Sequence, residues 1–180
     1  MNDRPLPQKA PEIDKLLGPL VRHGVDFVVV GGMAGLAHGS NYPSFDVDVA
    51  YARDAGNLER IVAALKQIGV TLRGAPPEQP FQIDVKTLQN GANFTFVTPY
   101  GDFDVLADVG GIRSYELLRA SSEEKEIAGV QVRVASIDHL IAMKRAVNRT
   151  KDQLMLEEYI VIADEQRRAD AQGSADPQSS

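Results

Sequence analysis

One stretch of this sequence decides the fold: Phe45-Asp46-Val47-Asp48-Val49-Ala50-Tyr51. Apolar and polar residues alternate over most of its length, which predicts a β-strand. Because successive side chains of a strand point to opposite faces, we expect Asp46 and Asp48 to share one face. Two carboxylates side by side repel each other unless a cation lies between them. The stretch therefore predicts both a strand and a candidate cation site.

The Asp46–Asp48 pair has two interpretations. Carboxylate oxygens at this spacing suit Mg²⁺ or Mn²⁺. Two such ions about 3.5–4 Å apart form the clamp that nucleotidyl transfer uses. The same short pattern also occurs on the solvated face of an edge strand, where it binds nothing. The surrounding sequence has to decide between a metal site and a polar surface.

A short apolar segment and a glycine pair precede this strand. Residues 26–30 are rich in β-branched residues and predict a strand buried on both faces, and residues 33–38 predict a helix. The intervening Gly31-Gly32 turn would leave backbone N–H groups free to bind phosphate. The alternative is a tight turn in which only glycine fits. The pattern is neither GxGxxG nor a P-loop, because no lysine follows the glycines.

A two-metal site needs a third carboxylate, and the segment 101–106 offers two. Asp102 and Asp104 share a face by alternation. Asp104 is preferred because it lies inside the predicted strand, where a carboxylate is costly to bury without a cation or hydrogen bonds. Asp102 is explained by the turn before that strand. Asp84 and Asp108 are further alternatives.

The remaining pattern predicts an α/β (α+β) fold with a sheet followed by a small helical end. Helices are expected at 11–23, 57–68, 115–118, 136–147 and 151–168, and strands at 81–85, 94–98, 103–106 and in a hairpin at 127–134. Residues 70–80 are expected to form a loop. By domain, we expect a flexible tail (1–10), a core (11–135), a C-terminal helical segment (136–168) and a disordered tail (169–180).

The composition limits the classes of protein. The 180 residues fit one domain, and the absence of cysteine excludes disulfides and thiolate metal sites. With no signal peptide and no apolar run near the ~20 residues that span a membrane, we expect a soluble cytoplasmic protein. The net charge of −6 argues against a nucleic-acid coat protein. An RNA substrate stays open because basic residues cluster at Lys144, Arg145, Arg149 and Lys151.

Taken together, these motifs resemble the nucleotidyltransferase superfamily that includes DNA polymerase beta. The resemblance is carried by the runs 29–34 (VVGGMA), 38–40 (HGS), 44–49 (SFDVDV), 101–106 (GDFDVL), 137–144 (IDHLIAMK) and 149–152 (RTKD). Within the superfamily, the chain is most similar to bacterial AbiEii/AbiGii-toxin-like and MenT-like nucleotidyltransferases. The likeness extends from about Phe27 to Tyr159.

The resemblance implies a nucleotidyltransferase-type mixed β-sheet flanked by helices. It also implies transfer of a nucleoside monophosphate from a nucleoside triphosphate to an acceptor hydroxyl. The implied metal ligands, for Mg²⁺ with Mn²⁺ as the alternative, are Asp46, Asp48 and Asp104, and Asp104 would help to deprotonate the acceptor. The implied nucleotide-binding residues are Gly31, Gly32, Ser40, Ser44 and Lys144. The acceptor is tRNA, a protein or a small molecule, and toxins of this group that act on tRNA have a neighbouring antitoxin.

One position departs from the family pattern. Many relatives carry arginine two positions before the Thr or Ser, where this chain has Tyr42, and tyrosine offers no guanidinium to phosphate. Arg53 is the candidate substitute; otherwise the chain is a weakly active or inactive nucleotide-binding or regulatory protein. A third interpretation is an unrelated α/β enzyme with one structural cation at Asp46 and Asp48. It predicts that Asp104 lies far from that pair.

Overall fold

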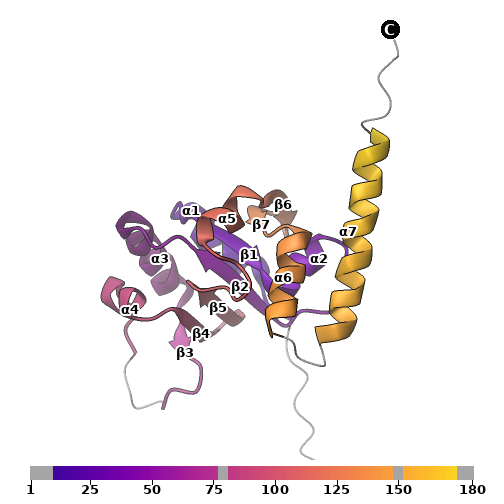
Figure 1. Cartoon of the computed structure of the whole chain (residues 1–180). Coiled ribbons are helices and arrows are strands. Elements are labelled where there is room, and N and C mark those ends of the chain that lie inside the picture. The colour runs from indigo at the N-terminus through magenta and orange to yellow at the C-terminus, as the bar shows by residue number, and fades with distance from the viewer. Residues whose placement is uncertain (1–9, 77–80, 148–151, 174–180) are drawn as a thin grey trace, which may run out of the picture.

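A mixed β-sheet carries the fold in the computed structural model of the chain (Figure 1). The structure describes residues 10–76, 81–147 and 152–173. Within these ranges the sheet has seven strands in the order β3-β4-β5-β2-β1-β7-β6. The strands are β1 (Phe27–Val30), β2 (Asp46–Tyr51), β3 (Thr71–Leu72), β4 (Asn93–Thr98), β5 (Gly101–Leu106), β6 (Glu123–Ile127) and β7 (Val130–Val134). The pairs β2–β5 and β1–β7 are parallel and the other neighbours are antiparallel.

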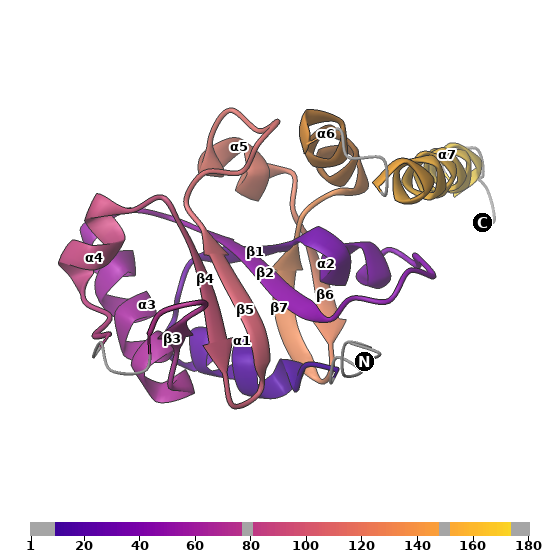
Figure 2. The ribbon, with the colours of Figure 1, turned by 90° about the horizontal axis from the view of Figure 1, so that it is seen from below.

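Helices cover both faces of this sheet. They are α1 (Ile13–Arg22), α2 (Gly31–Ala37), α3 (Ala55–Ile68), α4 (Val85–Asn90), α5 (Tyr115–Ala120), α6 (Ile137–Val147) and α7 (Gln153–Gly173). Figure 2 shows α1 and α3 on one face and α5, α6 and α7 on the other. The predicted α/β architecture with a C-terminal helical segment is confirmed.

The two faces of the central strands differ in character. On β2 and β5, the side chains of Val47, Val49, Phe103 and Val105 are fully buried and belong to the same core as leucines of α1 and α3. The alternate positions carry aspartates, which are only partly buried. One face of these strands therefore builds the apolar core, and the opposite face presents carboxylates toward α6.

Most of the strongly periodic segments fold as predicted. The strands at β1, β2, β4, β5 and the β6–β7 hairpin, and the helices α1, α3, α5 and α6, are confirmed to within a few residues. The Asp54 side chain caps α3 by accepting from the Asn57 N–H, and α3 ends at Gly69, whose φ of 79° is left-handed.

The segment between α3 and β4 differs from the prediction. The expected strand at 81–85 is absent, because the Asp84 carboxylate accepts from the backbone N–H and the hydroxyl of Thr87, each at 2.7 Å. This N-cap starts α4 at Val85, and capping prevails over a weak alternation. In the expected loop 70–80, the two-residue strand β3 pairs with β4. Residues 77–80 lie outside the described part of the chain.

The last helix is longer than predicted. Helix α7 runs to Gly173, so helix replaces the predicted disorder over residues 169–173. Two alanines and a glutamine in this stretch are favourable helix formers, so a polar segment continues as a solvent-exposed helix. Figure 1 shows this end of α7 projecting from the body. The predicted tails at residues 1–9 and 174–180 lie outside the described residues.

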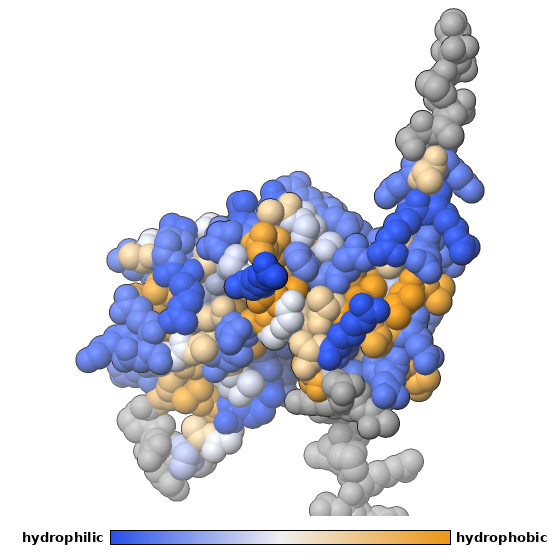
Figure 3. All heavy atoms as spheres, viewed as in Figure 1, coloured by the Kyte–Doolittle hydropathy of each residue, from blue (hydrophilic) through white to orange (hydrophobic). Residues whose placement is uncertain are grey.

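The surface is mostly hydrophilic in Figure 3, with apolar patches over the α6–α7 side. Large exposed hydrophobic side chains of these helices are Val147, Leu154 and Val161. In the described chain, no helix combines the length and the apolar content that a membrane crossing requires. Of these three residues, Val147 lines the cavity described below.

Helices α2 and α7 meet at an unusually close contact. Tyr159 is 1% exposed, and its hydroxyl lies against Gly35, where an added Cβ would collide with the phenol oxygen and lie 2.8 Å from Cζ. Burial raises the pKa of Tyr159 to about 12. Within the described residues, this hydroxyl has no hydrogen-bond partner. The glycine is therefore needed for the approach of α7 to α2.

We predict that Gly35→Ala lowers the free energy of unfolding by about 1–3 kcal/mol, because it overpacks this contact. Tyr159→Phe should be neutral or stabilising, because it removes a buried hydroxyl without a partner. The double variant should recover part of the loss. Urea denaturation of the four proteins checks this coupling, and simple additivity of the two single effects would contradict it.

Candidate active site

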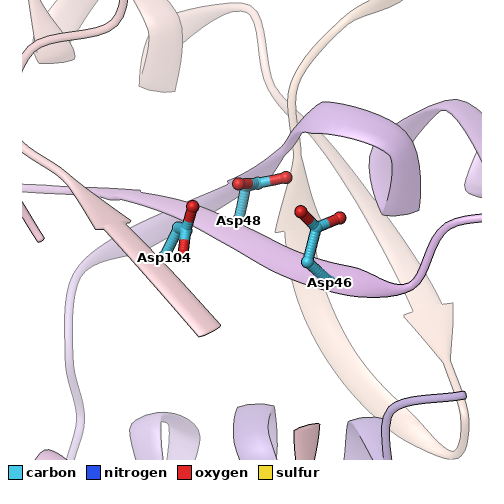
Figure 4. A group of neighbouring side chains, drawn as sticks. All are labelled: Asp46, Asp48 and Asp104. Atoms are coloured by element: carbon cyan, nitrogen blue, oxygen red, sulfur yellow. The ribbon is translucent and has the colours of Figure 1, made fainter. Parts of the chain in front are cut away.

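The parallel pairing of β2 with β5 brings the predicted carboxylates together. Asp46 is registered with Asp102, and Asp48 with Asp104. Ligand oxygens of Asp46, Asp48 and Asp104 all lie within 4.8 Å of one another (Figure 4). The third interpretation, an unrelated enzyme with one structural cation, predicted that Asp104 lies far from Asp46 and Asp48. That prediction is wrong.

The electrostatics of this triad are unfavourable without a cation. Burial, and then the charges of Asp46 and Asp104, raise the pKa of Asp48 to about 7. Burial also raises the pKa of Asp104, although Arg73 opposes this effect. Carboxylate oxygens that crowd in this way are the hard donors that Mg²⁺ and Mn²⁺ prefer. The donor set and its electrostatics fit a divalent ion.

An open cavity of about 790 Å³ lies above the triad. Its floor is formed by residues of β2 and β5, and α6 and α7 contribute an apolar wall of Met143, Val147 and Met155. Ligand cavities of proteins typically measure about 300–1,000 Å³. The cavity therefore has room for a nucleotide beside the carboxylates.

The glycine pair at the start of α2 packs directly against the site. Gly31 has a φ of 66°, and a Cβ there would collide with the Asp48 carboxylate. A Cβ at Gly32 would lie 2.7 Å from the Ser44 hydroxyl oxygen. That hydroxyl donates to the Asp46 carbonyl at 3.0 Å. Gly31 therefore requires glycine, a side chain at Gly32 would displace the Ser44 hydroxyl, and both residues line the cavity with Ser44.

Lys144 also faces this cavity. Its ammonium donates to the Asp152 carboxylate at 2.8 Å, and the Lys144 side chain is 21% exposed. Asp152 is not an ordinary surface residue, because it is 8% exposed and paired with Lys144. Arg149 and Lys151 of the predicted basic cluster lie outside the described residues.

No protein-family model and no curated protein matches the sequence. Solved structures do match. The structure of lincosamide antibiotic adenylyltransferase LnuA, bound to lincomycin, superposes with a TM-score of 0.56 at 14% identity and covers 84% of this chain and 96% of LnuA. A Thermotoga maritima protein assigned to the nucleotidyltransferases gives 0.52 at 13% identity over 82% of this chain and 89% of its own.

A third match is antibiotic-resistance factor ANT(2'')-Ia in complex with adenylyl-2''-tobramycin. Its TM-score is 0.51 at 16% identity, and the match covers 87% of this chain and 95% of that chain. The chain has the nucleotidyltransferase fold. Within it, the carboxylate triad, the glycine pair and Lys144 surround one cavity.

Two residues expected at the site lie elsewhere in this nucleotidyltransferase fold. The Ser40 hydroxyl donates to Glu158 of α7 at 2.6 Å, and Ser40 does not line the cavity. The proposal of Arg53 as a substitute for the missing arginine at Tyr42 is not supported. Its guanidinium donates to the carbonyls of Leu88 and Gln89 at 3.3 and 2.7 Å, because the end of α4 leaves carbonyls without helical partners.

Arg73 is a residue near the site that the sequence did not indicate. One guanidinium nitrogen lies 3.0 Å from Asp104 and 3.3 Å from Asp102. The backbone N–H of Arg73 donates to the Thr95 carbonyl, and Thr95 of β4 is paired with Asp104 of β5. A row across the sheet thus joins Arg73 to the triad. The pairing of the two-residue strand β3 with β4 places Arg73 in this row, and no local sequence motif predicts that pairing.

The raised pKa of Asp48 predicts a pH-dependent cost in the metal-free protein. Asp48 titrates at about 7 in the folded state and at about 4 when unfolded. The folded state therefore binds the proton more tightly than the unfolded state does. As a result, the contribution of Asp48 to the free energy of unfolding falls as pH rises from about 4 to about 7. With chelator present, Asp48→Asn should exceed wild type in stability by a margin that grows over this range and then levels off.

The margin should reach on the order of 1–4 kcal/mol. Denaturant titrations between pH 4 and pH 8 measure it, with Asp14→Asn on the exposed side of α1 as the control that should show no such trend. Added Mn²⁺ at pH 8 should raise the melting temperature of wild type and leave that of Asp48→Asn nearly unchanged. A margin that is independent of pH would contradict the prediction.

Proposed function

We propose that this protein is a metal-dependent nucleotidyltransferase that moves a nucleoside monophosphate from a nucleoside triphosphate to an acceptor hydroxyl. One observation carries the proposal: Asp46, Asp48 and Asp104 converge within 4.8 Å at the floor of a large cavity. The nucleotidyltransferase fold supports the same activity.

In this proposal, the three aspartates would hold Mg²⁺, with Mn²⁺ as the alternative. Bound divalent ions would supply positive charge for the phosphates and lower the pKa of the acceptor hydroxyl. The crowding that raises the pKa of Asp48 to about 7 favours such binding, because a cation removes the repulsion. The protein's share is to keep the three carboxylates in one place.

The phosphates would be bound by groups that adjoin the aspartates in the same cavity. Helix α2 begins at Gly31, so its first N–H groups have no helical partners and are available to phosphate oxygens. Ser44 and Lys144 line the same cavity and would add a hydroxyl and an ammonium. Asp152 orients that ammonium. Ser40 is left out of the proposed set because Glu158 engages its hydroxyl.

The transfer itself needs few groups. The acceptor oxygen forms a bond to the α-phosphorus, the bond between the α-phosphorus and the bridging oxygen breaks, and pyrophosphate leaves. Asp104 would accept the hydroxyl proton, because its carboxylate lies beside Asp48 at the floor of the cavity. Positioning and charge stabilisation supply most of the rate enhancement in reactions of this kind.

Two kinds of acceptor have support. The matched structures of LnuA with lincomycin and of ANT(2'')-Ia with adenylyl-2''-tobramycin favour a small hydroxylated molecule. The resemblance to AbiEii- and MenT-like enzymes favours tRNA, with a cognate antitoxin as partner. A protein acceptor is the third case. The same cavity serves each of them, so the acceptor has to be found by experiment.

A nucleotide-binding protein without turnover is the second candidate function. It is favoured by Tyr42, which stands where many relatives have arginine, and by Arg53, which is engaged at the end of α4. In this case nucleotide binding would remain and pyrophosphate would not form.

The test is a transfer assay with Mg²⁺ and each of four α-labelled nucleoside triphosphates. Total cellular RNA, a cell-extract fraction of small molecules and a protein fraction serve as acceptors. We expect label in one fraction and a loss of at least about 100-fold in Asp46→Asn/Asp48→Asn, because changes outside the ligand shell alone cost about 10–100-fold. Asp14→Asn serves as the folded control.

The outcomes separate the two candidates. Label in the RNA fraction establishes an RNA acceptor, and label in the small-molecule fraction establishes a small hydroxylated acceptor. A rise in melting temperature with Mg²⁺ and nucleoside triphosphate, without label or pyrophosphate, supports the binding protein. Absence of both transfer and binding contradicts the metal-dependent nucleotide site altogether.

A further inference from the structure

One face of α7 supports several parts of the site. Asp152, just before α7, holds Lys144; Tyr159 packs on Gly35 of α2; and the Gln166 amide lies 3.2 Å from the His38 ring at the end of α2. Tyr159 and Gln166 are seven residues apart, which places them on one side of α7, and Asp152 directly precedes the helix. Helix α7 thus contacts the elements that carry the candidate nucleotide-binding residues.

Glu158, the neighbour of Tyr159 in α7, makes the most concentrated contact. One carboxylate oxygen accepts from the Ser40 hydroxyl at 2.6 Å. The other accepts from the Asn41 backbone N–H at 2.9 Å and from the Asn41 side-chain amide at 3.0 Å. These bonds, that of Ser40 first, lower the pKa of Glu158, so its carboxylate is ionised at neutral pH. Both oxygens are used, and three donors converge on them.

The segment that Glu158 holds leads directly into the catalytic strand. Segment 40–45 is the later part of the connection from α2 to β2, and its Pro43, Ser44 and Phe45 line the cavity. The Tyr42 N–H donates to the Ser40 hydroxyl at 3.2 Å, which extends the anchor along the segment. In the described part of the chain, the side-chain hydrogen bonds from residues 40–42 to a later element all end on Glu158.

We propose that Glu158 is a positioning residue that fixes segment 40–45 and thereby sets the places of Ser44 and Asp46. The inference rests on the proposed function and adds a residue outside the cavity to it. Glu158 lines no part of the cavity, so it acts through the segment that it anchors. The Ser44 hydroxyl completes the connection by bonding to the Asp46 carbonyl.

The hydrogen bonds, rather than the negative charge, carry this role. Glu158→Gln removes the charge and keeps an acceptor oxygen for Asn41 and an amide that can donate to the Ser40 hydroxyl. Glu158→Ala removes all three bonds. Ser40→Ala removes the shortest bond with little risk to folding. Glu157→Ala, at the exposed neighbouring position, is the matched control.

The experiment measures Mn²⁺ binding by calorimetry and amide hydrogen exchange of residues 40–46 on the full chain. For Glu158→Ala we expect faster exchange in this segment and Mn²⁺ binding weakened by about 10-fold, the lower end of the usual cost of removing a supporting group. Ser40→Ala should show a smaller loss in the same direction. The Mn²⁺ affinity of Glu158→Gln should stay within about threefold of that of wild type, and Glu157→Ala should bind Mn²⁺ as wild type does.

Each outcome decides one point. Unchanged Mn²⁺ affinity in Glu158→Ala, or in Ser40→Ala if the first variant does not fold, overturns the positioning role. A loss in Glu158→Gln equal to that in Glu158→Ala also overturns it, because charge would then be the cause. If wild type itself does not bind Mn²⁺, the proposed function fails, whatever the variants show.

Discussion

The repulsion among three aspartates that the sheet holds together is the constraint on which the rest of the site depends. The parallel register of β2 and β5 places Asp104 beside Asp48, and strand alternation places Asp46 on the same face. Burial and mutual repulsion raise the pKa of Asp48 to about 7, so the arrangement is unfavourable in a protein without a cation. The buried apolar face of the same strands stabilises the sheet and keeps the carboxylates in place.

Helix α2 contacts both this site and helix α7. Gly31 lies against Asp48, Gly32 against Ser44 and Gly35 against the Tyr159 ring, so a side chain at any of the three would displace a neighbour. Gly31 and Gly32 line the cavity, and Gly35 lets α7 pack closely on α2. This explains why the last helix of the chain belongs to the site, although it lies far from the aspartates in sequence.

Local pattern predicted most of the elements because their periodicity is strong. The alternation that places Asp46 and Asp48 on one face belongs to the strand itself. The same alternation puts Asp102 and Asp104 on one face of β5, and the register with β2 places Asp104 beside Asp48. Prediction failed where the local signals were weak or in competition. In segment 81–85 the alternation predicted a strand, but the N-cap at Asp84 starts helix α4 instead.

The sequence by itself determined which carboxylates share a face, since side-chain direction follows from backbone geometry within a strand. Only the tertiary structure decided the partners of the charged and polar groups. Arg73 forms an ion pair with Asp104, Arg53 donates to carbonyls at the end of α4, and Ser40 donates to Glu158. These pairings depend on which distant segments pack together, and strand register and helix docking fix that only when the whole chain has folded.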